Sequence, residues 1–217
     1  MTASSLTSPS TGLRERNKRR RIEQILDATR SLLRERPDQS PSVERIAARA
    51  EVAPATIFNL IGPREQIWAA LADDLLAELE RRTTDLGSGD PHSHARAIAA
   101  TTVDIVCADA DVYRHVLANW SSSGRLLRRD PSRQLVACLQ TAADAGTLRD
   151  DLDLKALAEA ITTACTGAAH QWAAQLIDDR ALRRRCQTAV DLAFAAAAPS
   201  ANGIPDYVAA LRVRRRK

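Results

Sequence analysis

Aromatic residues and glycines are scarce in this sequence. Phe, Tyr and Trp together make up 3% of the 217 residues, and there are only eight glycines. No stretch shows the alternation of β-branched and polar residues that is typical of a half-buried strand. Alanine and leucine, which are strong helix formers, dominate instead, and a hydrophobic content of 45% is sufficient for a core. The composition therefore predicts an all-α fold.

Cysteines and long hydrophobic runs are also few. Cys107, Cys138, Cys165 and Cys186 lie far apart in the sequence, each within a helical pattern. This spacing predicts small buried residues in a reducing compartment, not a disulfide set or a zinc site. No apolar run approaches the roughly 20 residues that span a membrane, and the N-terminus lacks the apolar segment of a secretory signal. We therefore expect a cytoplasmic protein with no membrane partner.

Residue groups typical of enzyme active sites are missing from the sequence. There is no Gly-rich phosphate loop, no supported Ser/His/Asp or Cys/His set, and no pair of carboxylates in an apolar setting. His92 and His94 follow Asp90 in a predicted loop, but a metal site needs a further ligand. We therefore predict no enzymatic activity, no metal and no cofactor.

Positive charge is concentrated at the two ends of the chain. Residues 1–66 hold 12 Lys/Arg against 8 Asp/Glu, residues 67–211 hold 14 against 19, and residues 212–217 hold 5 against none. A basic N-terminal part beside an acidic middle part favours a protein whose N-terminal part meets phosphates.

Residues 42–67, SVERIAARAEVAPATIFNLIGPREQI, have the pattern of a helix-turn-helix. Apolar residues recur at helical spacing in 42–50, and residues 51–53 form a turn. Pro54 fits the first position of the next helix, because its missing N–H does no harm there. Two helices joined by a turn of this length place the second helix in the DNA major groove.

This stretch resembles the TetR (tetracycline-repressor-like) family of transcription regulators. The resemblance runs through Ile46–Ala50, Val52, Pro54–Phe58 and Arg64–Glu65. Glu51 stands where the family usually has a turn glycine. The resemblance implies a homodimeric regulator, most often a repressor, that binds a palindromic double-stranded DNA operator and is released by a small-molecule effector.

The chain divides into four predicted segments. We expect a disordered arm at 1–13, a three-helix helix-turn-helix domain at 14–66, a helical effector-binding and dimerisation domain at 67–199, and a basic tail at 200–217. Residues 121–124 are predicted to form a loop. About nine helices are expected, near residues 14–36, 42–50, 54–61, 63–85, 93–107, 112–120, 131–145, 154–177 and 180–197.

The predicted recognition helix, residues 54–61, should expose its polar residues to DNA. Asparagine reads adenine edges, and threonine bonds phosphate or meets a thymine methyl group. The basic run at 14–21 is either a solvated helix end or an arm that reaches the DNA backbone or minor groove. The candidate DNA-contacting residues are Arg19, Arg20, Ser42, Pro54, Ala55, Thr56, Phe58, Asn59, Leu60 and Arg64.

The two last predicted helices carry broad apolar surfaces of small residues, which let helices approach closely. Pairing with a second copy would bury these surfaces, and the candidate interface residues are Ala164, Ala168, Leu192 and Ala196. Residues with polar tips in an aliphatic body are either effector contacts or ordinary core residues. These are Tyr113, His115, Trp120, His170 and Trp172.

Two other functions remain compatible with the sequence. One is a helical-bundle binding protein or enzyme whose basic ends are incidental. The other is a DNA-binding regulator without a small-molecule effector. A steep fall of DNA affinity with salt would exclude the first, and stabilisation by small molecules would exclude the second.

Overall fold

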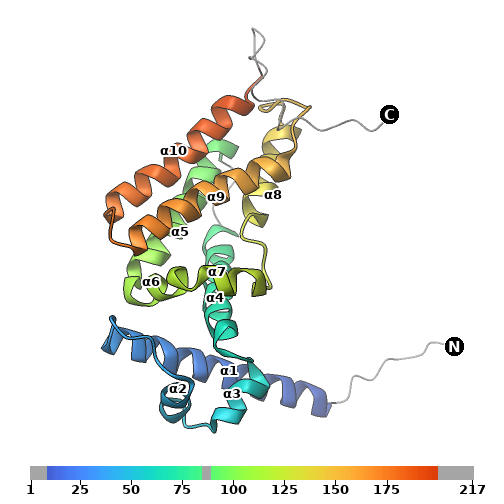
Figure 1. Ribbon diagram of the computed structural model, residues 1–217. Helices are drawn as coiled ribbons and strands as arrows, with labels where there is room; N and C mark the ends of the chain where they lie inside the picture. Colours follow the sequence, from blue (N-terminus) through green and yellow to red (C-terminus); the bar gives the residue numbers. More distant parts are fainter. Residues whose placement is uncertain (1–8, 85–88, 200–217) are drawn as a thin grey trace, which may run out of the picture. The chain divides into compact units, whose positions relative to one another are not determined.

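The computed structural model describes residues 9–84 and 89–199, and within them it contains ten α-helices, one 3-10 helix and no β-strand (Figure 1). The all-α prediction is therefore confirmed. None of the described helices combines the length and the apolar character that a membrane crossing requires. The elements are α1 (Pro9–Glu35), α2 (Val43–Arg49), α3 (Pro54–Leu60), α4 (Arg64–Thr84), α5 (Pro91–Ala108), α6 (Ala110–Ala118), α7 (Trp120–Ser123), η1 (Gly124–Leu126), α8 (Arg133–Asp144), α9 (Leu154–Ala173) and α10 (Asp179–Ala197).

The helices group into two compact units. The first comprises residues 9–71 together with Asn119–Leu126, and the second comprises residues 72–84, 89–118 and 127–199. The division falls inside α4, after Leu71, whereas the sequence suggested residue 66. The helix α4 therefore contributes residues to both units.

The first unit is built on α1. Its apolar stripe, which includes Ile25 and Leu33, is fully buried, as are Ile46 of α2 and Ile57 of α3. The Thr29 side chain is also buried, and its hydroxyl donates to the Ile25 carbonyl, which satisfies its polar group. These contacts confirm the helical spacing read from the sequence.

The second unit is a helical bundle in which α9 and α10 lie side by side (Figure 1). The helix α5 packs against α6, α8 and α10, and α9 also packs against α6 and α8. Aspartates cap the N-termini of three of these helices: Asp90 on α5, Asp153 on α9 and Asp178 on α10. Asp73 of α4 accepts from the backbone N–H groups of Arg128 and Arg129, which fixes the segment before α8.

Several predicted boundaries were wrong. Residues 9–13 are the first turn of α1 and not a disordered arm, because Pro9 fits a helix start. Residues 121–124 belong to α7 and η1 and not to a loop, which accounts for the tenth helix. The helix α9 ends at Ala173 and not at residue 177, because Gln175 adopts a left-handed conformation with φ 59°. The expected arm residues 1–8 and the basic tail 200–217 lie outside the described residues.

Candidate nucleic-acid interface

The helix-turn-helix is formed by α2, a three-residue turn and α3. The Ser42 hydroxyl accepts from the Arg45 backbone N–H at 3.3 Å and caps α2. At the other end of α2, the N–H groups of Glu51 and Val52 donate to the Ala48 and Ala47 carbonyls. This pair of bonds is a Schellman motif with Glu51 in the left-handed region, at φ 53°. Pro54 then begins α3 without a side-chain cap at Ala53.

Side chains of α1 and α2 hold this motif in place. The Gln24 amide of α1 donates to the Ala50 carbonyl at the end of α2, at 2.8 Å. Arg49 makes two hydrogen bonds of 2.6 and 2.8 Å to the Glu35 carboxylate, and these bonds lower the pKa of Glu35 below its usual value. Arg49 is thus committed to an ion pair inside the unit, and it is a poor candidate for a phosphate contact although it belongs to the helix-turn-helix.

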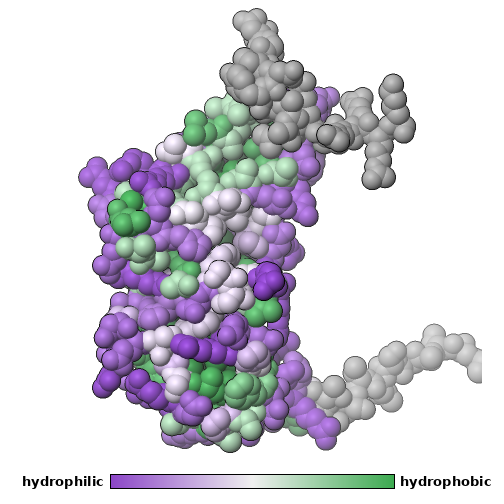
Figure 2. All heavy atoms as spheres, in the orientation of Figure 1, coloured by the Kyte–Doolittle hydropathy of each residue, from purple (hydrophilic) through white to green (hydrophobic). Residues whose placement is uncertain are grey.

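The exposed face of α3 differs slightly from the prediction. Pro54, Ala55, Phe58 and Asn59 are exposed, while Ile57 is fully buried. Phe58 is 53% exposed, and it is the only exposed large apolar side chain of α3. Figure 2 shows hydrophobic residues at the surface around α2 and α3. The side chains available to enter a groove are therefore Ala55, Phe58 and Asn59.

Thr56 and Leu60 were predicted on that same exposed face, and both are only half-buried at its edges. The reason is the phase of the helix: Thr56 and Leu60 are four residues apart and share one side, and Leu60 lies three residues after the buried Ile57. Their reach into a groove is therefore more restricted than that of Asn59.

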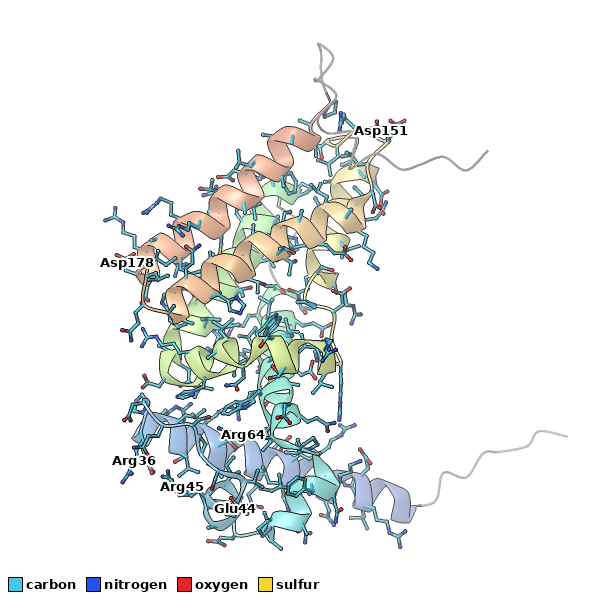
Figure 3. All side chains as sticks on the ribbon, in the orientation of Figure 1. Arg36, Glu44, Arg45, Arg64, Asp151 and Asp178 are labelled. Atoms are coloured by element: carbon cyan, nitrogen blue, oxygen red, sulfur yellow. The ribbon has the colours of Figure 1, made fainter. Side chains whose placement is uncertain are left out.

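Two exposed arginines flank α3, and Figure 3 labels both. Arg64 at the start of α4 donates to the Ser40 hydroxyl, and its guanidinium lies 5.8 Å from the centroid of the Trp68 ring. Arg45 is exposed on the first turns of α2. Arg45 is not among the residues predicted from the sequence, although its spacing from the buried Ile46 and Ala47 places it on the outer side of α2.

The basic run lies in the N-terminal part of α1 and is helical. An α-helix is about 10–12 Å across and the minor groove is about 6 Å wide, so this run cannot enter the minor groove as an extended arm does. Residues 14, 18 and 21 share one side of α1. The buried Ile25 and Leu32 continue the same stripe, four and eleven positions after residue 21. Arg16 and Arg19 lie on the other side.

This arrangement changes which basic residues best fit a phosphate contact. The side of α1 with Ile25 and Leu32 is buried in the first unit, and Arg14, Lys18 and Arg21 extend this side. Arg20 precedes Gln24 by four residues and Ser31 by eleven, and both of these bond to α2, so Arg20 also lies toward the helix-turn-helix, whereas Arg19 points away from it. All of these side chains are exposed.

The candidate effector residues are divided between the two units. Trp120 belongs to the first unit, where its ring packs against Gly124, and the other four belong to the second unit. Trp172 is buried, and its indole N–H donates to Asp179 at 2.6 Å. His170 Nδ1 lies 2.8 Å from the Thr166 carbonyl oxygen. Tyr113 is buried and His115 is half-buried on α6.

Arg114 was not selected from the sequence, and it stands out among the described arginines. Five of them are half-buried, and four of these pair with an aspartate: Arg30 with Asp27, Arg96 with Asp191, Arg149 with Asp151 and Arg183 with Asp104. Within the described residues Arg114 has no acidic partner. Its Nε is buried without a hydrogen bond, and its guanidinium lies 4.9 Å from the centroid of the Trp172 ring.

The candidate dimer residues lie mostly on one surface. Ala164 and Leu192 are exposed and Ala196 is half-buried, but Ala168 is buried inside the protomer and contributes to its own core. Pale and green residues of low polarity extend over α9 and α10 in Figure 2. The exposed uncharged residues of this face are Ala160, Thr163, Ala164, Gly167, Thr188, Leu192 and Ala195.

The arrangement of a helix-turn-helix unit followed by a helical bundle is the fold of the TetR-type transcription regulators. One similar structure is FadR of Thermus thermophilus, a TetR family transcriptional repressor solved in complex with lauroyl-CoA. It matches this chain with a TM-score of 0.68 and 19% sequence identity, over 85% of this chain and 98% of that chain. A putative TetR-family regulator from Syntrophomonas wolfei has a TM-score of 0.64 and 15% identity over 81% and 95% of the two chains. The fatty acid degradation regulator FadR from Bacillus halodurans matches with a TM-score of 0.59 and 16% sequence identity. The match covers 80% of this chain and 94% of that chain. No protein-family model and no curated protein sequence matches the chain.

Proposed function

We propose that this chain is a transcription repressor that binds a palindromic DNA operator as a homodimer and leaves it when an effector binds the second unit. The observation that carries this proposal is the exposed face of α3. Ala55, Phe58 and Asn59 project from a helix that α1 and α2 hold rigidly, and exposed arginines flank it. Side chains of these types read base edges and methyl groups, while arginines position the protein on phosphates.

A selection from random double-stranded oligonucleotides tests this function directly. We expect an enriched palindrome whose half-sites lie about 10 bp apart or a multiple of that. Affinity should fall steeply between 50 and 200 mM salt, in proportion to the number of phosphates contacted. Enrichment of no sequence, together with salt-independent binding, would exclude a DNA-binding regulator.

Asn59→Ala separates base reading from phosphate contact. A bidentate asparagine–adenine contact is worth roughly 1–3 kcal/mol, so this variant should lose preference at one base pair of each half-site. The matched variant Arg64→Ala should weaken binding to the selected and the scrambled DNA equally. It should also lower the slope of binding affinity against salt concentration. Identical profiles for the two variants on the two DNAs would show that the roles are assigned wrongly.

The effector is proposed to be an anion that pairs with Arg114. A half-buried cation without an acidic partner gains from a negatively charged ligand, since burial weakens its hydration. The Nε of Arg114, which has no hydrogen-bond partner among the described residues, could donate to a carboxylate or phosphate oxygen. One neighbour of the same fold was solved with lauroyl-CoA, which is an anion, and this is the first compound to test.

Thermal shifts with and without Arg114 test the effector class. At 100 times its dissociation constant a ligand stabilises the protein by about 2.7 kcal/mol, which is readily detected. We expect anionic compounds to stabilise the wild type and to lower its operator affinity, and we expect Arg114→Gln to remove both effects. The control is Arg96→Gln, since Arg96 already pairs with Asp191. Neutral or cationic ligands that act equally on Arg114→Gln would contradict an anionic effector.

The homodimer is proposed to form through the uncharged exposed residues of α9 and α10, which lie between Ala160 and Gly167 on α9 and between Thr188 and Ala195 on α10. Effector binding would then shift the population between two dimer shapes, only one of which fits successive major grooves. The helix α4 is the proposed route, because it contributes residues to both units.

A further inference from the structure

Two of the four cysteines are brought together by the packing of α9 against α10. All four are free, and Cys165 and Cys186 are separated by 21 positions in the sequence. In the structure α9 packs against α10, and the Cys186 side chain is the main influence on the pKa of the Cys165 thiol. Cys165 is half-buried on α9, and Cys186 is buried on α10.

The register of the two helices supports this pairing independently. Trp172 near the end of α9 bonds to Asp179 at the start of α10. Cys165 precedes Trp172 by seven residues, and Cys186 follows Asp179 by seven. Seven residues make close to two full helical turns, so residues seven apart lie on nearly the same face of a helix. In an antiparallel pair the two cysteines must then face each other two turns away from the Trp172–Asp179 bond.

The other two cysteines provide an internal contrast. Cys138 donates to the Pro91 carbonyl at 3.0 Å, and burial raises the pKa of its thiol to about 11. Burial and the neighbouring Asp179 carboxylate raise the pKa of Cys107 to about 11 as well. Both thiols therefore stay protonated and unreactive at neutral pH.

The pKa values of the Cys165 and Cys186 thiols are shifted in opposite directions. The hydrogen bond from the Cys186 thiol lowers the pKa of Cys165, because it stabilises the Cys165 thiolate. The same bond and burial raise the pKa of Cys186, against the opposing effect of Arg183. A thiolate that is partly accessible, next to a second thiol, is the usual arrangement of an attacking and a resolving cysteine.

We propose that Cys165 and Cys186 form a reversible dithiol–disulfide switch that hydroperoxides oxidise. The Cys165 thiolate attacks the terminal peroxide oxygen, the O–O bond breaks, and the alkoxide leaves and takes up a proton. Cys165 is then a sulfenic acid. The Cys186 sulfur attacks the Cys165 sulfur, the S–O bond breaks, and hydroxide leaves with the Cys186 proton as water. The two sulfurs give up two electrons, and the peroxide is reduced to an alcohol and water.

The disulfide would join the two helices whose exposed faces form the proposed dimer surface. Oxidation would therefore fix α9 against α10 and oppose any change of dimer shape that needs them to slide. This regulatory consequence rests on the proposed function, whereas formation of the disulfide does not.

The chemical test is a thiol count on the full chain after treatment with hydrogen peroxide. We expect the wild type to fall from four titratable thiols to two, with a mass loss of two hydrogens, and dithiothreitol to restore all four. The variants Cys107→Ser and Cys138→Ser should each lose the same two thiols. Cys165→Ser and Cys186→Ser should form no intramolecular disulfide, and Cys186→Ser should accumulate the Cys165 sulfenic acid, which dimedone traps. An unchanged thiol count, or a bridge between two chains, would overturn the proposal.

A second measurement addresses regulation separately. Oxidised and reduced wild type are compared for operator affinity and for the loss of affinity that the effector causes. We expect oxidation to reduce the effector response at least several-fold, and Cys165→Ser to show no such change with peroxide. Equal responses in the two forms would refute the regulatory role while leaving the disulfide established. Absence of operator binding in both forms would instead contradict the proposed function.

Discussion

Individual residues at helix ends decide where the turns of this molecule fall. The helices α2, α8 and α9 all end in the same pair of backbone hydrogen bonds, with a residue of positive φ between helix and turn. Gly146 occupies this position after α8, at φ 69°, whereas Glu51 and Gln175 occupy it after α2 and α9, at φ 53° and 59°. A side chain in this conformation costs roughly 1–2 kcal/mol, which glycine avoids.

Glu51→Gly should therefore stabilise the protein. Relief of the left-handed strain exceeds the greater flexibility of glycine in the unfolded chain, so we expect about 1 kcal/mol of added stability in urea or thermal unfolding. Gln175→Gly is the matched variant and should act in the same direction. Gly146→Ala should do the reverse by a similar amount. If Glu51→Gly lowers stability, then Glu51 makes a contact that outweighs its strain.

Residues that act through their neighbours in the chain were predictable from the sequence. Pro54 begins α3 as its position indicated, because the fit of proline at the first position of a helix depends only on the local chain. The Arg49–Glu35 ion pair, the Cys165–Cys186 pair and the position of Arg114 over Trp172 were not predictable. Each of these contacts depends on how two helices align along their lengths. Amphipathic spacing predicts which face of a helix is buried, but it does not predict that alignment.

At the scale of elements, the basic run at 14–21 is helical, in agreement with the helix expected near residues 14–36. Six of the eight residues at 14–21 are Lys or Arg. In an exposed helix, physiological salt screens the repulsion between these charges beyond a distance of about 8 Å. Both lysine and arginine also have good helix propensity. The run therefore continues α1, and its side chains take positions fixed by the turn of the helix. An extended arm would have left all six free to choose their contacts.

The two sides of this helix make a charge-matched experiment. Replacing Arg14 and Arg21 by alanine removes the same charge as replacing Arg16 and Arg19. We expect the first double variant to lower the salt slope of operator binding by up to about 2 units, one per lost phosphate contact, and the second to lower it by less. The measurement is operator affinity across a salt series for both variants and the wild type. Equal slopes for the two variants would mean that net charge alone matters and that α1 has no DNA-facing side.

For the whole molecule, the sequence predicted the two-part organisation better than the site residues. The basic N-terminal part, the helix-turn-helix pattern and the Ala-rich final helices were each sufficient to indicate their role in a TetR-type fold, and the fold is confirmed. The polar-tipped residues of the body remain a prediction, and two of them, Trp172 and Tyr113, are buried within the bundle. Burial of a polar tip depends on partners such as Asp179, which only the packed structure reveals.

The assembly of two copies is tested best at Leu192, which is 65% exposed on α10. In a lone protomer Leu192→Glu places a charge in water at little cost, so helical content and thermal stability of the fold should remain. In the proposed dimer the same carboxylate is buried against small apolar residues without a cation, at a cost of several kcal/mol. We expect sedimentation at micromolar concentration to show a dimer for the wild type and a monomer for the variant, which should also lose operator affinity. Leu126→Glu, an exposed leucine on η1 outside α9 and α10, is the control and should remain dimeric. A wild-type monomer, or a dimeric Leu192→Glu variant, would show that α9 and α10 do not form the interface.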